Sequence, residues 1–144
     1  MKRAVIDWSA LRRSAMDALQ NAYAPYSQYR VAAALLAEDG RVFVGVNVEN
    51  ASYGLTLCAE RNAVVAAVAA GARRFLALVI VVSVDDPATP CGACRQVLRE
   101  HGPSFPVRSY GSKGRPRISS VSALLPASFG PDNLRRARGP RTRK

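Results

Sequence analysis

The chain of 144 residues is 49% hydrophobic and has a formal net charge of +11. This length and apolar content fit one domain with a sizeable core, and no stretch approaches the roughly 20 apolar residues of a membrane span. Much of the charge is terminal, because six basic residues follow Leu134 with no acidic residue among them: Arg135, Arg136, Arg138, Arg141, Arg143 and Lys144. We therefore expect a single domain over 1–134 and a basic, disordered tail over 135–144.

The first third of the chain predicts a helix followed by a hairpin. Ser9 is a suitable cap for a helix with apolar residues at helical spacing, which should end before Pro25. Two apolar runs, 31–37 and 42–46, flank an Asp-Gly turn and predict paired antiparallel strands.

The rest of the chain alternates between the two kinds of element. A second helix is expected over 56–70, and alanine and valine cover so much of its surface that it should be buried rather than amphipathic. The β-branched run 75–84 predicts a central strand, 91–102 a third helix, 106–110 a further strand and 120–125 a short helix. Strands alternating with helices predict an α/β layered domain.

The three cysteines of the chain lie in two short segments. Cys58 stands two residues before Glu60, and Cys91 and Cys94 form a Cys-x-x-Cys pair after a proline. Thiolates suit Zn²⁺, and three protein ligands leave one tetrahedral position open, as in catalytic zinc sites where a water molecule becomes acidic. Both segments are predicted at helix N-termini, which favour thiolates. We expect one zinc ion held by the three cysteines, with Glu60 free to carry protons.

Other interpretations of the cysteines explain less. Inert core thiols are common, but a Pro-Cys-Gly turn at the start of a helix is not typical of them. A redox Cys-x-x-Cys pair leaves Cys58 and Glu60 without a role. The odd count and the absence of an apolar N-terminal segment argue against a disulfide framework and favour the cytoplasm. His101, in the last turn of a predicted helix, suits the helix dipole better than a metal. Arg61 is either a donor that moderates the negative charge of three thiolates or an ordinary surface arginine.

Six motifs follow one another along the chain: Tyr23-Ala-Pro-Tyr-Ser27, Tyr29-Arg-Val31, Asn47-Val-Glu-Asn-Ala-Ser-Tyr-Gly54, Cys58-Ala-Glu-Arg61, Pro90-Cys-Gly-Ala-Cys-Arg-Gln96, and Leu124-Leu-Pro126 with Ser128-Phe129. In this order they resemble the zinc-dependent cytidine deaminase family over almost the whole chain. Three cysteines in one short domain look like its homotetrameric branch. The resemblance implies a three-layer α/β/α domain with a central mixed sheet, one Zn²⁺ per subunit and sites completed by neighbouring subunits.

The same resemblance implies hydrolytic deamination of cytidine and 2′-deoxycytidine to the uridines, with release of ammonia, in pyrimidine salvage. Glu60 would move protons between water, ring N3 and the departing amine. Asn47 and Glu49, two apart on a predicted strand and so on one face, would bind the sugar hydroxyls. Tyr29 would stack on the pyrimidine; without the resemblance it is a core aromatic. Further substrate contacts are implied for Ala59, Tyr53 and Phe129, the last two reaching toward a neighbouring subunit.

Two departures from the family leave substrate preference open. Ala32 stands where the family usually has glycine and could tighten the floor of the pocket, and the loop 113–117 is unusually basic. Three competing hypotheses are a deaminase of another cytosine-bearing molecule such as blasticidin S, a polynucleotide deaminase, and an inactive zinc-stabilised nucleic-acid-binding module. Asn47 and Glu49 favour a simple ribose over a modified nucleoside. A pocket closed by neighbouring subunits has no room for a polynucleotide strand. An inactive, zinc-stabilised module would need a fourth zinc ligand. We therefore expect a small nucleoside substrate and no specific nucleic-acid or membrane partner.

Overall fold

A computed structural model describes residues 5–137. In chain order its elements are α1 (Trp8–Leu19), β1 (Val31–Ala37), β2 (Val42–Val46), the 3₁₀ helix η1 (Tyr53–Leu55), α2 (Ala59–Ala69), β3 (Phe75–Val82), α3 (Gly92–His101), β4 (Pro106–Tyr110), β5 (Arg117–Ser120), α4 (Val121–Leu124) and α5 (Pro131–Ala137). The strands form one five-stranded sheet in the order β2-β1-β3-β4-β5. Only β3 and β4 pair in parallel within it, so the sheet is mixed.

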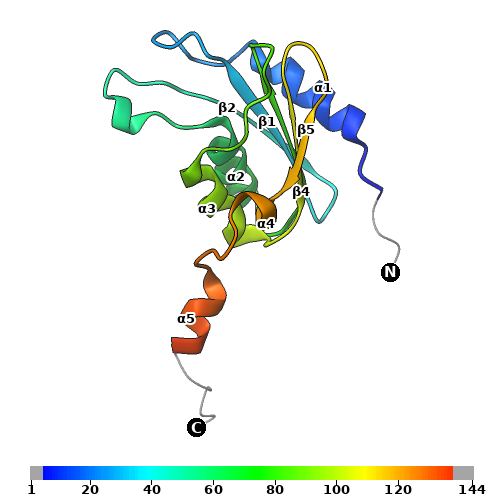
Figure 1. The fold of residues 1–144 in the computed structure, drawn as a ribbon, viewed down its shortest axis with the longest axis vertical. Helices are drawn as coiled ribbons and strands as arrows, with labels where there is room; N and C mark the ends of the chain where they lie inside the picture. Colours follow the sequence, from blue (N-terminus) through cyan, green and yellow to red (C-terminus); the bar gives the residue numbers. More distant parts are fainter. Residues whose placement is uncertain (1–4, 138–144) are drawn as a thin grey trace.

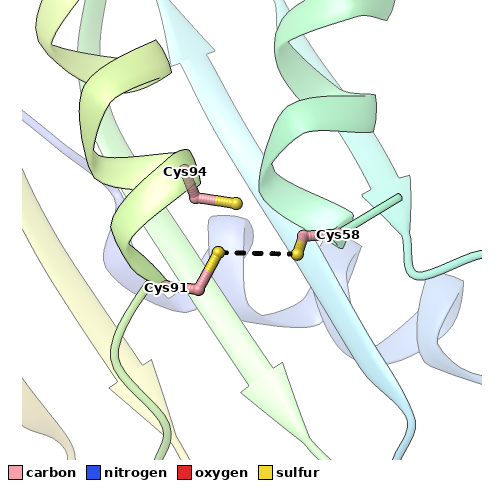
Figure 2. Close-up of side chains that lie close together, drawn as sticks. All are labelled: Cys58, Cys91 and Cys94. Carbon is pink, nitrogen blue, oxygen red and sulfur yellow. Dashed lines mark hydrogen bonds between the residues drawn. The ribbon is translucent and has the colours of Figure 1, made fainter. Parts of the chain in front are cut away.

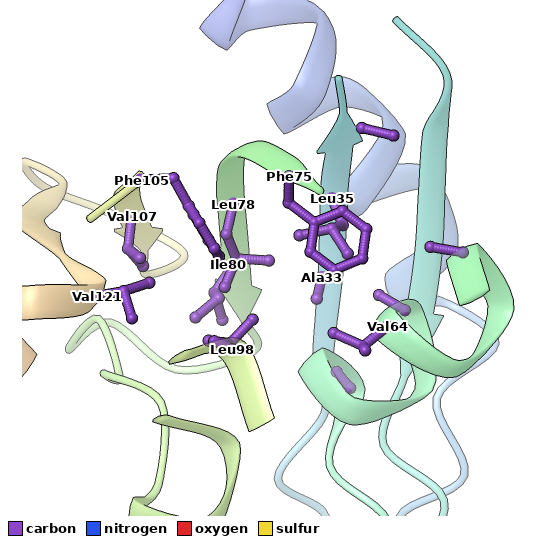
Figure 3. Close-up of a cluster of buried hydrophobic side chains, with 14 of the residues drawn as sticks. Ala33, Leu35, Val64, Phe75, Leu78, Ile80, Leu98, Phe105, Val107 and Val121 are labelled. Atoms are coloured by element: carbon purple, nitrogen blue, oxygen red, sulfur yellow. The ribbon is translucent and has the colours of Figure 1, made fainter. Parts of the chain in front are cut away.

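Helices cover both faces of this sheet (Figure 1). On one face α1 buries Leu11 and Ala15 against small apolar side chains of β1 and β3. On the other face α2 and α3 enclose a larger core, which includes Val64 and Leu98 (Figure 3). The predicted three-layer α/β/α arrangement is confirmed.

Strand β3 is the centre of the molecule. It pairs with β1 on one side and with β4 on the other, and seven of its eight residues are buried. Leu78 and Ile80 belong to the core beneath α2 and α3, while Ala77 and Val79 belong to the core beneath α1. This two-sided burial explains why its sequence is a continuous apolar run without polar alternation.

Several boundaries differ from the expectation. The cap of α1 is Asp7, whose carboxylate accepts a hydrogen bond from Ala10 N at 2.9 Å, so Ser9 lies inside the first turn. Helix α2 begins at Ala59 and not at residue 56. It is also not wholly buried, because Val65, on its outer face, is 66% exposed. The expectation of a buried helix is wrong for this face of the single chain.

The end of the described chain adds two elements that the sequence did not predict. Strand β5 pairs antiparallel with β4, and α5 runs across the expected domain boundary at residue 134. Residues 135–137 therefore continue a helix and do not begin a tail. The remainder of the predicted basic tail, 138–144, lies outside the described residues. None of the helices in the described range is long and apolar enough to cross a membrane.

One end of the sheet gathers the segments that carry the motifs. In the register of the sheet, Val31 at the start of β1 lies opposite Val82 at the end of β3, and Ala32 lies opposite Val46 at the end of β2. The connection that leaves β2 at this end leads through η1 to α2, and the one that leaves β3 leads to α3 (Figure 1). The first residues of both helices therefore meet at the same edge.

Candidate active site

The three cysteines converge from two helix starts, as Figure 2 shows. Cys58 is the N-terminal cap residue of α2, Cys91 caps α3, and Cys94 lies in the first turn of α3. The three Sγ atoms lie within 4.8 Å of one another, and those of Cys58 and Cys91 are 3.7 Å apart. Sulfur ligands of a tetrahedral zinc, each at about 2.3 Å from the ion, are roughly 3.8 Å apart. The donor set and its spacing fit Zn²⁺.

The surroundings of these thiols favour a thiolate. The neighbouring Cys94 thiol and the Arg61 guanidinium stabilise a negative charge on Cys58 and lower its pKa to about 5. The proximity of Cys58, together with burial, raises the pKa of Cys94. Arg61 Nη2 lies 3.6 Å from Cys58 Sγ and 3.3 Å from the carbonyl oxygen of Thr56. Of the two interpretations of Arg61, this geometry favours the donor to a thiolate.

Glu60 lies in the first turn of α2 and is only 5% exposed. Burial raises the pKa of its carboxyl, and the negative charge of Cys58 raises it further, against the lowering effect of Cys94 and Arg61. A carboxyl whose pKa is moved toward neutrality can accept and release protons near working pH. The structure thus places a buried carboxyl with a raised pKa beside the cysteine cluster.

The start of α2 is fixed by close contact with β2. A Cβ atom on Gly45 would lie 2.3 Å from Ala59 O and 2.4 Å from Ala63 N, so only glycine fits there. Asn62 Nδ2 also donates to Val46 O at 2.8 Å. Ala59 is completely buried at this contact.

The turn before α3 is held by Arg95. Its guanidinium donates to Pro90 O at 2.7 Å and to Thr89 Oγ1 at 3.0 Å. It also donates to Leu124 O, at the end of α4, at 2.9 Å. The backbone just before Cys91 is therefore tied both to its own helix and to the C-terminal part of the chain.

Asn47 and Glu49 lie just beyond the end of β2, and their side chains hold the segment before β1. Asn47 is 8% exposed; its Oδ1 accepts from Val31 N at 2.9 Å and its Nδ2 donates to Tyr29 O at 2.8 Å. Glu49 accepts hydrogen bonds from the turn at Tyr26 and Ser27. Each side chain keeps unused hydrogen-bonding capacity for a ligand.

A cavity of about 230 Å³ adjoins Glu49. Its lining consists of Tyr26, Ser27, Glu49, Tyr53 and Thr56. The rings of Tyr26 and Tyr53 pack against each other in a tilted arrangement, with their centroids 5.9 Å apart. Sequence reasoning did not assign Tyr26, Ser27 or Thr56 to the site. Tyr26 and Ser27 belong to the Tyr23–Ser27 motif, but their partner Glu49 is more than twenty residues away in the chain.

Three other predicted residues are placed differently. Tyr29 is half-buried and packs against the core beneath α2 and α3. Burial and the negative charges of Asp86 and Glu60 raise the pKa of its phenol, so the phenol lies within reach of the Glu60 charge. Tyr53 and Phe129 are 75% and 59% exposed in the single chain. Tyr53 lines the cavity beside Glu49, and the carbonyl oxygen of Phe129 accepts from Gln96 Nε2 on α3 at 3.0 Å.

Two further features lie away from this site. Ala32 belongs to the core beneath α1, so its methyl group faces away from the cysteines and does not tighten a pocket there. A larger cavity, of about 320 Å³, lies at the opposite end of the sheet, between the end of β1 at Ala37 and the segment 71–74. Its distance from the thiols and from Glu60 separates it from the candidate chemistry.

Comparison with known proteins gives consistent results. The family model described as "Cytidine and deoxycytidylate deaminase zinc-binding region" matches residues 7–107. Cytidine deaminase of Mycobacterium tuberculosis is 49% identical over 133 residues, covering 92% of this chain and 97% of its own. That of Sporosarcina psychrophila is 44% identical over 130 residues, covering 90% and 96%. A crystal structure of cytidine deaminase from Burkholderia pseudomallei superimposes with a TM-score of 0.82 at 48% identity, covering 86% of this chain and 100% of the other.

Proposed function

The chain belongs to the cytidine and deoxycytidylate deaminase family with its zinc-binding region, and from this membership we propose that it deaminates cytidine and 2′-deoxycytidine to the uridines. The observation that carries the proposal is the buried carboxyl of Glu60 beside three converging thiols. The reaction would consume one water molecule: its oxygen becomes the carbonyl oxygen at C4, the C4–N bond breaks, and ammonia leaves. A role in pyrimidine salvage follows from this chemistry.

Cys58, Cys91 and Cys94 would hold the zinc ion and leave one tetrahedral position for water and substrate. When bound, zinc supplies Lewis acidity that makes a water molecule nucleophilic near neutral pH. Glu60 would take a proton from that water, pass one to N3 of the pyrimidine and help protonate the departing amine. Its raised pKa suits it to both directions of transfer.

The substrate would be oriented from the opposite side by the segments at the end of β2. Asn47 and Glu49 would bind the sugar hydroxyls, and the Tyr29 ring, held through its own backbone by Asn47, would stack on the base. Ala59, at the start of α2, would contact the base between the sugar side and Glu60. This arrangement favours a free nucleoside over a polynucleotide.

Homotetramerisation would complete the site. Several large apolar side chains stand exposed on the single chain, which is typical of surfaces that neighbours cover; among them are Tyr53 at 75%, Val65 at 66%, Leu55 at 65% and Phe129 at 59%. Tyr53 and Phe129 would then reach a neighbouring subunit's site. A cytoplasmic location, where thiols stay reduced, agrees with a cysteine-ligated metal.

The test is the loss of cytidine's ultraviolet absorbance on adding purified, zinc-replete protein, with the metal content and the mass in solution measured on the same sample. We expect turnover of cytidine and deoxycytidine, one zinc per chain and a tetramer, and no turnover by Glu60→Ala. A protein with one zinc per chain that leaves both nucleosides unchanged would refute the proposed substrates and shift the weight to a modified nucleoside or a polynucleotide.

A further inference from the structure

The turn that precedes β1 is held in place by the carboxylate of Glu49. Glu49 Oε2 accepts from Tyr26 N at 2.9 Å and from Ser27 N at 3.2 Å, while the Ser27 hydroxyl donates to Oε1. Gln28, the next residue, has a positive φ of 59°, a conformation that non-glycine residues seldom adopt. The surrounding hydrogen bonds must therefore maintain this turn.

The Ser27 hydroxyl has two partners with separate duties. Besides donating to Glu49, its oxygen accepts from Tyr29 N at 3.0 Å. Asn47 fixes the other side of Tyr29 by donating to its carbonyl oxygen at 2.8 Å. One hydroxyl group thus joins the side chain proposed to bind the sugar to the backbone of the residue proposed to stack on the base.

The lone pairs of Glu49 show what remains for a ligand. A carboxylate has about four acceptor positions, two on each oxygen. Among the described residues, the two backbone donors occupy both positions of Oε2, and Ser27 occupies one position of Oε1. The fourth position, on Oε1, is left for a ligand, and Glu49 lines the cavity of about 230 Å³ together with Ser27. The direction of this free acceptor is fixed by the two backbone donors on Oε2 together with the Ser27 hydroxyl, which is the side-chain donor on the same oxygen as the free position.

We propose that Ser27 is a positioning residue for nucleoside recognition, which aims the free acceptor of Glu49 at a sugar hydroxyl and sets its distance from Tyr29. The inference rests on the proposed function, since it deepens the sugar-binding part of that site. Ser27 would act through Glu49 and would not touch the reacting atoms. Its loss would weaken substrate binding and leave the chemical step nearly intact.

The sharpest test uses two isosteric variants, Ser27→Thr and Ser27→Val, which differ only in the hydroxyl group. Each is assayed with cytidine and with 2′,3′-dideoxycytidine, which lacks the sugar hydroxyls that Glu49 would bind. For Ser27→Val we expect the KM for cytidine to rise about tenfold, as for loss of a hydrogen bond to a charged group. The kcat should stay within about twofold, and the KM for the dideoxynucleoside should hardly change.

Three controls separate positioning from folding. Ser27→Thr should restore the KM for cytidine. Zinc content should be unchanged in both variants. Ser14→Ala, which removes a hydroxyl that donates to Ala10 O on α1, away from the cysteines, should behave as the wild type.

A double variant tests whether Ser27 acts through Glu49. When Glu49 is already replaced by glutamine, adding Ser27→Val should raise the KM by a further factor of less than about two, because the effects of residues that act as one unit are not additive.

The inference would be overturned by an unchanged KM in Ser27→Val, by equal increases for both nucleosides, or by a fall in kcat with KM unchanged. Equal losses in Ser27→Thr and Ser27→Val would also overturn it, because the hydroxyl would then not matter. If the wild type itself fails to turn over cytidine, the proposed function falls first and this inference with it. Normal wild-type turnover with an unaffected Ser27→Val rejects the inference alone.

Discussion

Replacing Gly45 with alanine should move the start of α2 without replacing any residue of the proposed site. The added Cβ would lie 2.3 Å from Ala59 O and 2.4 Å from Ala63 N, both backbone atoms that cannot rotate away. Restoring ordinary van der Waals contact at roughly 3.4 Å requires a displacement of about 1 Å between β2 and α2. Cys58 and Glu60 would move with the helix, while Cys91 and Cys94, on α3, would not.

The expected effects follow from this displacement. Overpacking of this kind costs about 1–3 kcal/mol, which for a chain of this size lowers the melting temperature by about 3–12 °C. A misplacement of about 1 Å at a catalytic group lowers the rate by about 10²-fold, and zinc ligands tolerate only about 0.2 Å. We therefore expect Gly45→Ala to bind zinc more weakly and to lose about 10²-fold in kcat/KM.

The assay is a chelator titration of bound zinc together with steady-state kinetics on cytidine. Gly92→Ala is the matched control, because it lies between Cys91 and Cys94 and its added Cβ would meet no atom within 4 Å. Gly92→Ala should keep wild-type zinc affinity and activity. If Gly45→Ala also keeps both, the contact between β2 and α2 does not position the site, and the reasoning is refuted.

Three further predictions follow from particular contacts. Asn47→Ala should lower the free energy of unfolding by about 1–3 kcal/mol, since two partly buried backbone groups lose their partner; an unchanged urea midpoint would contradict this. Hydrogen bonds from Ser27 and from backbone N–H groups hold the pKa of Glu49 below its ordinary value of 4.5. The Glu49 carboxylate should therefore stay ionised until the pH falls below 4.5. NMR of its labelled carboxyl carbon should show that Glu49 titrates at a higher pH in Ser27→Val than in the wild type. A wild-type midpoint at or above 4.5 would contradict these hydrogen bonds. Val65→Glu should dissociate the proposed tetramer, as measured by light scattering, and a variant that remains tetrameric would place the interface elsewhere.

The parts of the fold that sequence predicts well depend on local signals. The hairpin of β1 and β2 follows from two apolar runs around an Asp-Gly turn, and β3 from its unbroken β-branched run. The convergence of Cys58, Cys91 and Cys94 could be predicted because metal-ligand spacing constrains both helix starts.

The parts that were missed depend on tertiary contacts or on weak local patterns. Strand β5 has four residues, two of them exposed, and exists because β4 offers an edge to pair with. Ser9 and Asp7 are equally suitable caps for α1 by side-chain type, and the structure uses Asp7, two residues before the predicted Ser9. The tether between Glu49 and Ser27 joins residues 22 apart, and no local pattern announces it.

The exposed outer face of α2 was missed for a related reason. A helix rich in alanine and valine has almost no polar residue to mark its outer side, so its composition does not separate burial within the chain from burial against a neighbour. Val65 is 66% exposed in the single chain, so it is not buried within the chain and can be buried only against a neighbour.

The most direct test of the account is a comparison of the wild type with Glu60→Gln, in which bound zinc and cytidine turnover are measured on the same samples. The carboxamide keeps the size of the side chain but cannot carry protons. The account predicts one zinc per chain in both proteins, with kcat lower in the variant by at least about 10²-fold, the lower end of what general acid–base catalysis contributes. A Glu60→Gln protein that binds zinc and retains most of its kcat would contradict the assignment of Glu60 and, with it, the proposed mechanism.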